Sequence, residues 1–202
     1  MINFLGLCVL NLIKSIKYVL ARQVRFSEII NKAAAISYDS LPISLIIAFI
    51  SAAVIAIQVS KQFLMTGAES YIGGTLAIVL IREIAPGFVA LAIGARAGTA
   101  ISAEIANMQV TSQVDAIKTL KVDPVGYYFA PRIIAAGLNV TMVVLLAEFV
   151  GTIGGMLVSY GTIELHPARY MHSVWAWLST RDIYISLLKA SIFGGLIALV
   201  CA

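Results

Sequence analysis

The chain has 202 residues, of which 60% are apolar and 12% are charged, and it carries a formal net charge of +4. Soluble domains contain about 45–50% apolar and about 25% charged residues, so the composition indicates an integral membrane protein. The excess of Lys and Arg is then typical of loops that face the cytoplasm and anionic headgroups, and we expect no nucleic-acid partner.

Residues 1–39 carry too many charges to cross a membrane. Their charged residues recur at the spacing of one helical face, which predicts an amphipathic helix lying in the membrane interface. The alternative is a solvated basic helix ahead of the first span. The residues on this face are Lys14, Lys17, Arg25, Glu28 and Lys32.

Four apolar stretches follow, each long enough to cross about 30 Å of hydrocarbon. The first has no charge between Ser40 and Ser60, whereas each of the later three contains charged residues. Trp175 and Trp177 precede the last stretch, as in the aromatic belt of a membrane protein. The predicted spans are residues 40–65, 70–100, 131–163 and 182–202.

The basic residues predict the orientation. Segments 1–39 and 96–132 together contain nine Lys and Arg, whereas the connection 164–182 contains two. The positive-inside rule therefore places the N-terminus and the 96–132 connection in the cytoplasm.

The second span contains Leu80-Ile-Arg-Glu-Ile-Ala-Pro86. A charged side chain at mid-bilayer costs at least about 2.5–3.5 kcal/mol, so Arg82 and Glu83 are expected to face a partner, a cavity or water. Pro86 lacks the N–H that would bond the carbonyl of Arg82, which predicts a break in the helix. These features favour a substrate site that lines a cavity. The alternative is an ion pair that only fixes packing, for example Arg82 with Glu148 of the third span.

Small residues stand at steps of four in two spans. Ala90, Gly94 and Gly98 follow the charged motif, and Gly151 and Gly155 form a second pair. This spacing lets helix backbones approach closely. It predicts tight helix pairing or a dimer.

Residues 104–121 form a polar, amphipathic segment between the second and third spans. Ser112 with Asp115 is a capping-box-like start, and Pro124 ends the segment. The segment predicts a short helix on the cytoplasmic surface. We interpret it as a coupling helix that docks into a groove of another protein, and the alternative is an ordinary connector.

The sequence lacks the motifs of several enzymes, namely a phosphate-binding loop, a His-Glu-x-x-His zinc motif and a Gly-x-Ser-x-Gly nucleophile elbow. The chain is therefore not expected to hydrolyse ATP or to be an enzyme. His166 and His172 have no third ligand near them in the sequence, so we expect surface or interfacial residues and no metal site.

Several strings in this order resemble the MlaE/YrbE permease family, whose members are membrane subunits of ABC transporters that work with MCE proteins and move lipids. The resemblance covers about residue 27 to residue 202. The strings are Leu80-Ile-Arg-Glu-Ile-Ala-Pro86, Gly94-Ala-Arg-Ala-Gly98, Ala103-Glu-Ile-Ala-Asn-Met-Gln-Val-Thr111, Gln113-Val-Asp-Ala116, Val122-Asp-Pro124 and Pro131-Arg132.

The resemblance implies an all-α polytopic membrane protein with an N-terminal interfacial helix and a cytoplasmic coupling helix, in one permease domain over residues 1–202. It also implies a fifth span, so the chain is expected to be incomplete at its C-terminus. The implied partners are a second copy of the chain, an MCE-domain protein, a lipid substrate and an ABC ATPase subunit that binds ATP and Mg²⁺. No cofactor is implied for this chain itself, and the implied location is the cell inner membrane.

The resemblance also implies roles for residues. It places a lipid cavity at the dimer interface and an ATPase-facing segment at the cytoplasmic end. Ser112 departs from the Glu that the family often has there. Together with the charged motif, the expected cavity or intramembrane polar residues are Gln58, Arg82, Glu83, Pro86 and Glu148, and the expected ATPase-coupling residues are Glu104, Met108, Gln113, Asp115 and Pro124.

The sequence thus predicts a permease subunit that moves phospholipid or a related lipid across or out of the inner membrane, driven by a separate ATPase. One alternative is an ion-coupled secondary transporter that uses Glu83, Glu148 and Lys189. Another is a membrane scaffold that transports nothing, in which the intramembrane charges are packing pairs.

Overall fold

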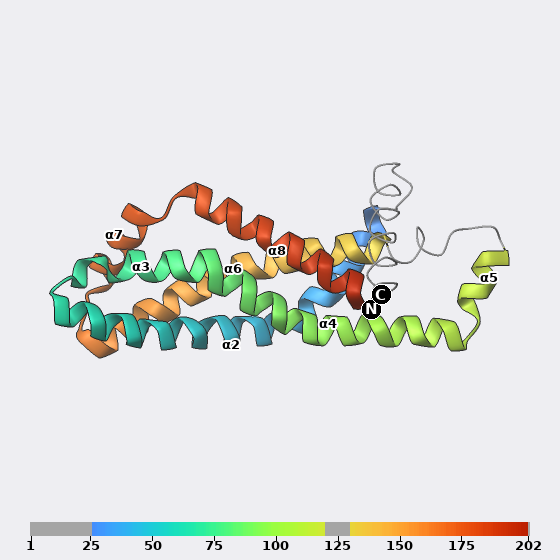
Figure 1. The fold of residues 1–202 in the computed structure, drawn as a ribbon, viewed down its shortest axis with the longest axis horizontal. Helices are drawn as coiled ribbons and strands as arrows, with labels where there is room; N and C mark the ends of the chain where they lie inside the picture. The colour runs from blue at the N-terminus through green and yellow to red at the C-terminus, as the bar shows by residue number, and fades with distance from the viewer. Residues whose placement is uncertain (1–25, 120–129, 202) are drawn as a thin grey trace, which may run out of the picture. The chain divides into compact units, whose positions relative to one another are not determined.

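The computed structural model describes residues 26–119 and 130–201. The described residues are almost entirely helical, which confirms the predicted all-α fold class (Figure 1). The elements are α2 (Phe26–Thr66), η1 (Glu69–Tyr71), α3 (Ile72–Val79), η2 (Leu80–Ile84), α4 (Ala85–Val110), α5 (Gln113–Thr119), α6 (Ala130–Ile163), α7 (Pro167–Trp177) and α8 (Thr180–Cys201).

Among the described residues, four helical segments are long and apolar enough to cross a membrane, which confirms a multi-pass membrane protein. The second segment joins η1, α3, η2 and α4 and extends beyond the predicted end at residue 100. Of the predicted interfacial helix, residues 1–25 lie outside the described residues, and residues 26–39 continue without a break into the first span. The segments are Ser40–Thr66, Glu69–Val110, Pro131–Ile163 and Thr180–Cys201.

The chain divides into two compact units, and the long helices continue from one unit into the other. The α3 unit contains Leu41–Ala92 and Thr141–Ala190. The α5 unit contains Met1–Ser40, Ile93–Val140 and Ser191–Ala202, as far as these ranges are described.

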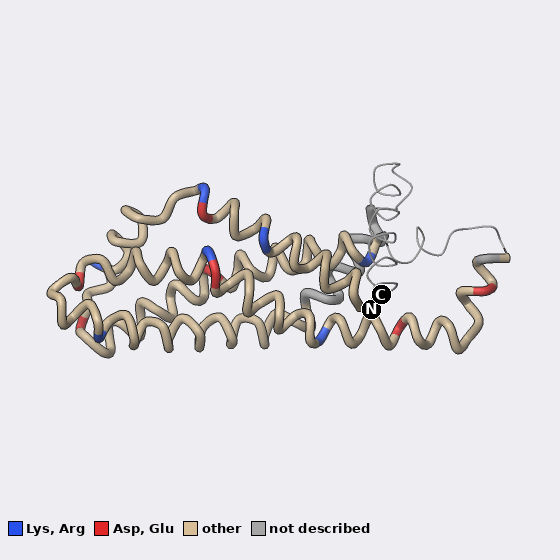
Figure 2. The backbone as a smooth tube through the Cα atoms, viewed as in Figure 1, with Lys and Arg blue, Asp and Glu red and all other residues tan. Residues whose placement is uncertain are grey.

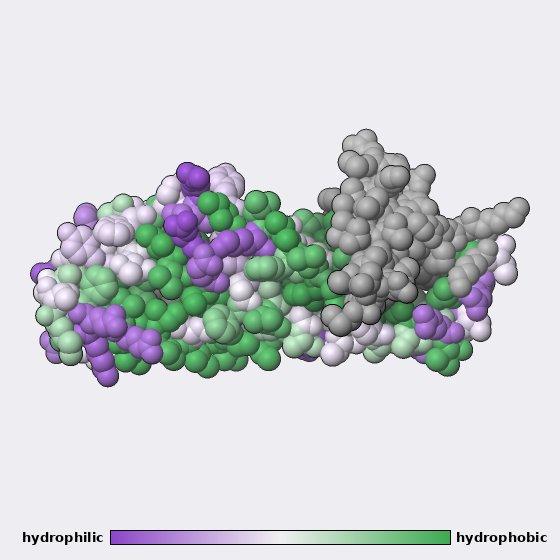
Figure 3. Space-filling model, in the orientation of Figure 1, coloured by the Kyte–Doolittle hydropathy of each residue, from purple (hydrophilic) through white to green (hydrophobic). Residues whose placement is uncertain are grey.

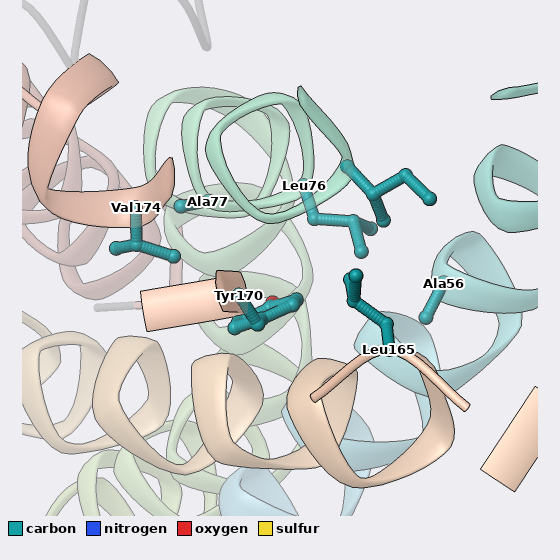
Figure 4. Packing of buried hydrophobic residues seen from close by; sticks show 7 residues of the cluster. Ala56, Leu76, Ala77, Leu165, Tyr170 and Val174 are labelled. Atoms are coloured by element: carbon teal, nitrogen blue, oxygen red, sulfur yellow. The ribbon is translucent and has the colours of Figure 1, made fainter. Parts of the chain in front are cut away.

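The core of the α3 unit forms where α7 packs against α3. Pro167 suits the first turn of α7, where a missing N–H needs no partner, and the N–H of Ala168 donates to Nδ1 of His166 (3.3 Å) to cap the helix. The sequence indicated only a connection here, so this helix is a finding of the structure. Figure 4 shows the core residues Ala56, Leu76, Ala77, Leu165, Tyr170 and Val174.

Two adjacent glycines of α3 allow this close contact. A Cβ on Gly73 would collide with the carbonyl oxygen of Tyr170, and a Cβ on Gly74 would lie 2.7 Å from Cγ of Trp177. The N–H of Gly74 also donates to Oγ of Ser173 at 3.0 Å, a hydrogen bond that joins the two helices. The absence of side chains at these positions therefore decides how near α7 can lie.

The predicted pair Gly151 and Gly155 packs within the same unit. A Cβ on Gly151 would lie 2.8 Å from a methyl carbon of Leu80, and a Cβ on Gly155 would lie 2.8 Å from the hydroxyl oxygen of Tyr170. Ala90 is buried in α4. These contacts lie within one chain, so the dimer stays a prediction.

In the α5 unit, the predicted row that contains Gly94 and Gly98 brings α4 against α8. A Cβ on Gly94 would lie 3.0 Å from Ile197, and a Cβ on Gly98 would lie 2.6 Å from Sγ of Cys201. Ser102, one turn further, donates from Oγ to the carbonyl of Cys201 at 2.7 Å. Close approach here is thus accompanied by a side-chain hydrogen bond between the helices.

The segment 104–121, expected to be one capped helix, is divided in the structure. Residues 104–110 complete α4, and α5 covers Gln113–Thr119. Ser112 between them has φ of 57°, a left-handed conformation that a right-handed helix does not contain. The helix therefore stops and starts again, and the carbonyl of Ser112 accepts the first hydrogen bond of α5 from the N–H of Ala116 (3.0 Å).

Gly73→Ala is expected to destabilise the protein by about 1–3 kcal/mol, because the added methyl group meets the backbone of Tyr170 and α7 must move away from α3. The thermal unfolding midpoint of the detergent-solubilised protein measures this change.

Gly87→Ala is the matched control. Gly87 also lies inside a helix of the α3 unit, and a Cβ on it meets no atom within 4 Å. Alanine at this position is expected to leave the midpoint unchanged or to raise it, since it favours a helix over glycine by about 0.5–1 kcal/mol. Equal midpoints for the two variants would contradict the packing of α7 on α3.

Candidate functional site in the membrane-spanning helices

The predicted break in the second span is a widened turn. Residues Leu80–Ile84 are π-helical, and Pro86 follows them as a buried residue. A proline removes one backbone donor, and its ring clashes with the carbonyl four residues earlier. The π turn shifts the bonding by one residue, so that the N–H of Ala85 bonds the carbonyl of Leu80. The helix is therefore not broken as expected, but it passes the proline with an altered hydrogen-bond pattern.

Lys189 of α8 bonds the carbonyl that Pro86 cannot bond. Its Nζ donates to the carbonyl oxygen of Arg82 at 2.8 Å and to Oε1 of Glu83 at 2.9 Å. In hydrocarbon, an unsatisfied carbonyl and an unpaired carboxylate are both costly. One ammonium group thus satisfies both.

The side chain of Arg82 pairs with Asp182, in the first turn of α8, where Nε and Oδ1 lie 3.6 Å apart. The suggested pair of Arg82 with Glu148 is wrong. Glu148 is buried on α6 and accepts a hydrogen bond from Oγ of Ser186 instead. Neighbouring helical residues point about 100° apart, which is why Arg82 and Glu83 take different partners.

One face of α8 supplies all of these partners. Asp182, Ser186 and Lys189 stand at steps of four and three, the spacing of a single helical face. Sequence reasoning identified Lys189 as an intramembrane charge but missed Asp182 and Ser186, although this spacing within an apolar helix was the available signal. We name the whole group the polar cluster, and its residues are Arg82, Glu83, Glu148, Asp182, Ser186 and Lys189.

The polar cluster is open on one side. The side chains of Arg82 and Glu83 are 49% and 69% exposed. Figure 2 shows charged positions on η2 and on the adjoining first half of α8, with uncharged helix on either side. In Figure 3 the hydrophilic side chains at this place are bordered by apolar surface. The arrangement therefore offers a cation and an anion to a ligand beside apolar groups.

Gln58 is not brought into the polar cluster. It lies on α2 with an exposed side chain, and within residues 26–119 and 130–201 no hydrogen bond or ion pair joins it to the cluster.

Glu104, a predicted ATPase-coupling residue, forms an ion pair inside the α5 unit. Its Oε1 lies 2.5 Å from Nη2 of Arg132, and Arg132 is only 2% exposed. The pair joins the last part of α4 to the first turn of α6. In the sequence, Arg132 was recognised only as one residue of the Pro131-Arg132 string that resembles the permease family, and no role was predicted for it.

The other predicted coupling residues lie near the end of α4 and on α5. Met108 is partly exposed, and Gln113 and Asp115 are exposed. Pro124 lies outside the described residues. The side chains of Gln113 and Asp115 are therefore accessible to a partner protein.

The sequence matches the family described as Permease MlaE over residues 29–202. A probable ABC transporter permease protein from Synechocystis is 34% identical over 183 residues, which are 91% of this chain and 70% of the relative. One from Rickettsia prowazekii is 34% identical over 186 residues, 92% of this chain and 72% of the relative. The chloroplastic protein Trigalactosyldiacylglycerol 1 of Arabidopsis thaliana is 31% identical over 144 residues, 71% of this chain and 41% of the relative.

Lys189→Met is expected to destabilise the protein by about 1–2 kcal/mol, because methionine leaves the carbonyl of Arg82 and the carboxylate of Glu83 without their donor. The unfolding midpoint in detergent measures the loss. Lys61→Met is the matched control, since Lys61 is exposed on α2 and has no ion pair among the described residues. It is expected to change the midpoint little.

Pro86→Ala tests why Lys189 is needed. Alanine restores an N–H that can bond a carbonyl of the preceding turn, so Lys189→Met should cost less stability in the Pro86→Ala background than in the parent. An equal cost in both backgrounds would contradict a role for Lys189 at the freed carbonyl.

Proposed function

The chain belongs to the MlaE permease family, and from that membership we propose that it moves a phospholipid or related lipid across or out of the inner membrane. As an ABC transporter permease it is a transport subunit rather than a catalytic enzyme. In the proposal, a separate ATPase subunit binds ATP and Mg²⁺ and drives the movement. An MCE-domain protein and a second copy of the chain complete the assembly.

The observation that carries this proposal is the continuity of the helix that holds Arg82 and Glu83. α3, η2 and α4 run without a break from Ile72 to Val110. The segment that contains this run is 42 residues long, about twice the roughly 20 that a membrane needs. In the proposal, a displacement received at α4 is passed along this helical run toward the polar cluster.

α5 is the proposed receiver of that displacement. The chain turns at Ser112, so that α5 leaves the line of α4 (Figure 1). Gln113 and Asp115 are exposed on it and can contact a partner. The ion pair of Glu104 with Arg132 joins α4 to the first turn of α6, so that in the proposal a displacement of α4 also moves this part of α6.

A lipid is the ligand that suits a polar cluster set into an apolar surface. Arg82 can pair with a headgroup phosphate and Glu83 with a headgroup amine, because charge-assisted hydrogen bonds are the strong ones. Phe88 and Leu91, one and two turns further along α4, are exposed and can contact acyl chains. The Arabidopsis relative is named after a glycerolipid, which supports this substrate class.

The proposed orientation places the N-terminus and α5 in the cytoplasm. The bias of Lys and Arg toward segments 1–39 and 96–132 supports it. Family membership favours this ABC permease over the ion-coupled transporter.

Asp115→Arg is expected to lower ATPase copurification and substrate-stimulated ATP hydrolysis about tenfold, which corresponds to about 1.4 kcal/mol of lost docking. Both are measured on the complex reconstituted in vesicles. Glu164→Arg is the control, a charge reversal at an exposed carboxylate between α6 and α7. Unchanged values for Asp115→Arg would remove α5 from the ATPase interface.

Glu83→Ala is expected to lower lipid transfer between vesicles about tenfold while the ATPase still copurifies, because the headgroup loses a partner. Glu83→Gln, which keeps the size of the side chain, should lower transfer in the same direction. Glu69→Ala, near the start of the same span, is the control. Transfer at the parent rate in both Glu83 variants would contradict a substrate role for the polar cluster.

A further inference from the structure

α7 exposes large aromatic side chains although it lies beside membrane-spanning helices. Trp175 is 75% exposed, and Trp177 forms an edge-on contact with the half-exposed Tyr71, with ring centres 5.6 Å apart. The opposite face of the helix is buried and includes Tyr170 and Ser173. The buried face of α7 packs against α3, whereas its aromatic face is exposed in this chain.

We propose that this partner is the bilayer itself, and that α7 lies in the boundary between headgroups and acyl chains of one leaflet, with Trp175 against lipid. In the proposed orientation this is the outer leaflet. Indole rings favour that boundary because they join a large apolar surface to an N–H that bonds water or headgroups. This inference goes beyond the transport function and does not rest on it.

The neighbours of α7 belong to helices that can cross a membrane. Tyr170 packs against Gly155 of α6 and shares a core with Ala56 of α2. At about 1.5 Å per residue, these two positions lie about 12 Å and about 15 Å before the ends of their helices. Both belong to segments that can cross a membrane. α7 therefore lies beside the spans and not beyond their ends.

The exposed face of α7 changes in polarity along the helix. Arg169 and His172 are exposed in its first half, and Trp175 and Trp177 are exposed in its second half. A helix that enters the interface from the aqueous side meets headgroups first and acyl chains later. This order of residues suits a lipid boundary better than a uniformly polar or uniformly apolar protein surface.

The first turn of α8, next to α7, has its backbone N–H groups capped by side chains. The N–H of Arg181 donates to Oγ of Ser179 (3.4 Å), and the N–H of Ser179 donates to Oδ2 of Asp182 (3.2 Å), a reciprocal capping box. Asp182 also pairs with Arg82. Non-helical backbone at membrane depth is tolerated where protein groups satisfy it. The non-helical link between α7 and α8 is therefore capped by protein groups.

Anchoring α7 in this way sets the depth of the polar cluster. The second span is 42 residues long, far more than the roughly 20 that a membrane needs, so its own length does not fix its position. α7 contacts it at Gly73 and Gly74, and Glu83 lies about 13 Å further along the helix. Half the hydrocarbon thickness is about 15 Å. The carboxylate thus lies near the middle of the bilayer.

Intrinsic fluorescence tests the proposal, because both tryptophans of the sequence lie in α7. The protein is reconstituted in phosphatidylcholine vesicles, and the difference in emission between the parent and Trp175→Phe isolates Trp175. Lipids brominated near the headgroup are expected to reduce this emission at least about twofold, as for a ring buried about 5–10 Å into the interface. Lipids brominated at the chain end should reduce it less, and aqueous iodide should have little effect.

Two results would overturn the proposal. Strong quenching by iodide without quenching by bromine would place Trp175 in water, and protection from both quenchers would indicate that a protein surface covers α7. Because Trp175 is exposed, Trp175→Phe is expected to keep the unfolding midpoint and the transport rate of the parent. The difference signal therefore reports on a folded protein.

Discussion

The structure around the polar cluster depends on one missing backbone hydrogen bond. Pro86 removes a backbone donor inside a segment that can cross a membrane, and the helix there has a π turn and a freed carbonyl at Arg82. Lys189 supplies the replacement donor and brings a charge, which Glu83 balances. α8 must therefore lie where its Lys189 reaches η2, so the packing of two helices follows from the chemistry of one residue.

Glycine determines the second layer of organisation. Gly73 and Gly74 let α7 lie against α3, and Gly94 and Gly98 let α8 lie against α4. In lipid, close backbone contact takes over part of the work that the hydrophobic effect does in water, since apolar side chains gain little by leaving acyl chains for each other. The same glycines that permit the packing also bring donors within reach, as with Ser102 and the carbonyl of Cys201.

The second span combines close helix contacts at its glycines with a π turn that carries exposed charged side chains. The helix that contains η2 continues into α4 as far as Val110, and the proposed transmission of a displacement depends on that continuity. The π turn lies at the place where the proposed ligand would sit, and such turns occur often at functional sites because they re-aim side chains. In the proposed mechanism, a displacement of α4 would act on the turn where the side chains of Arg82 and Glu83 are exposed and able to change partners.

The sequence by itself determined the class of protein, the spans and the location of the intramembrane charges, because hydropathy and charge are local properties that the bilayer reads directly. It did not determine which charges pair. The alternative of a packing ion pair named Glu148 as an example partner of Arg82, whereas the structure pairs Arg82 with Asp182, and the sequence does not predict α7 as a helix. Ion pairs and helix docking depend on the relative rotation of segments far apart in the chain, and only tertiary packing sets that rotation.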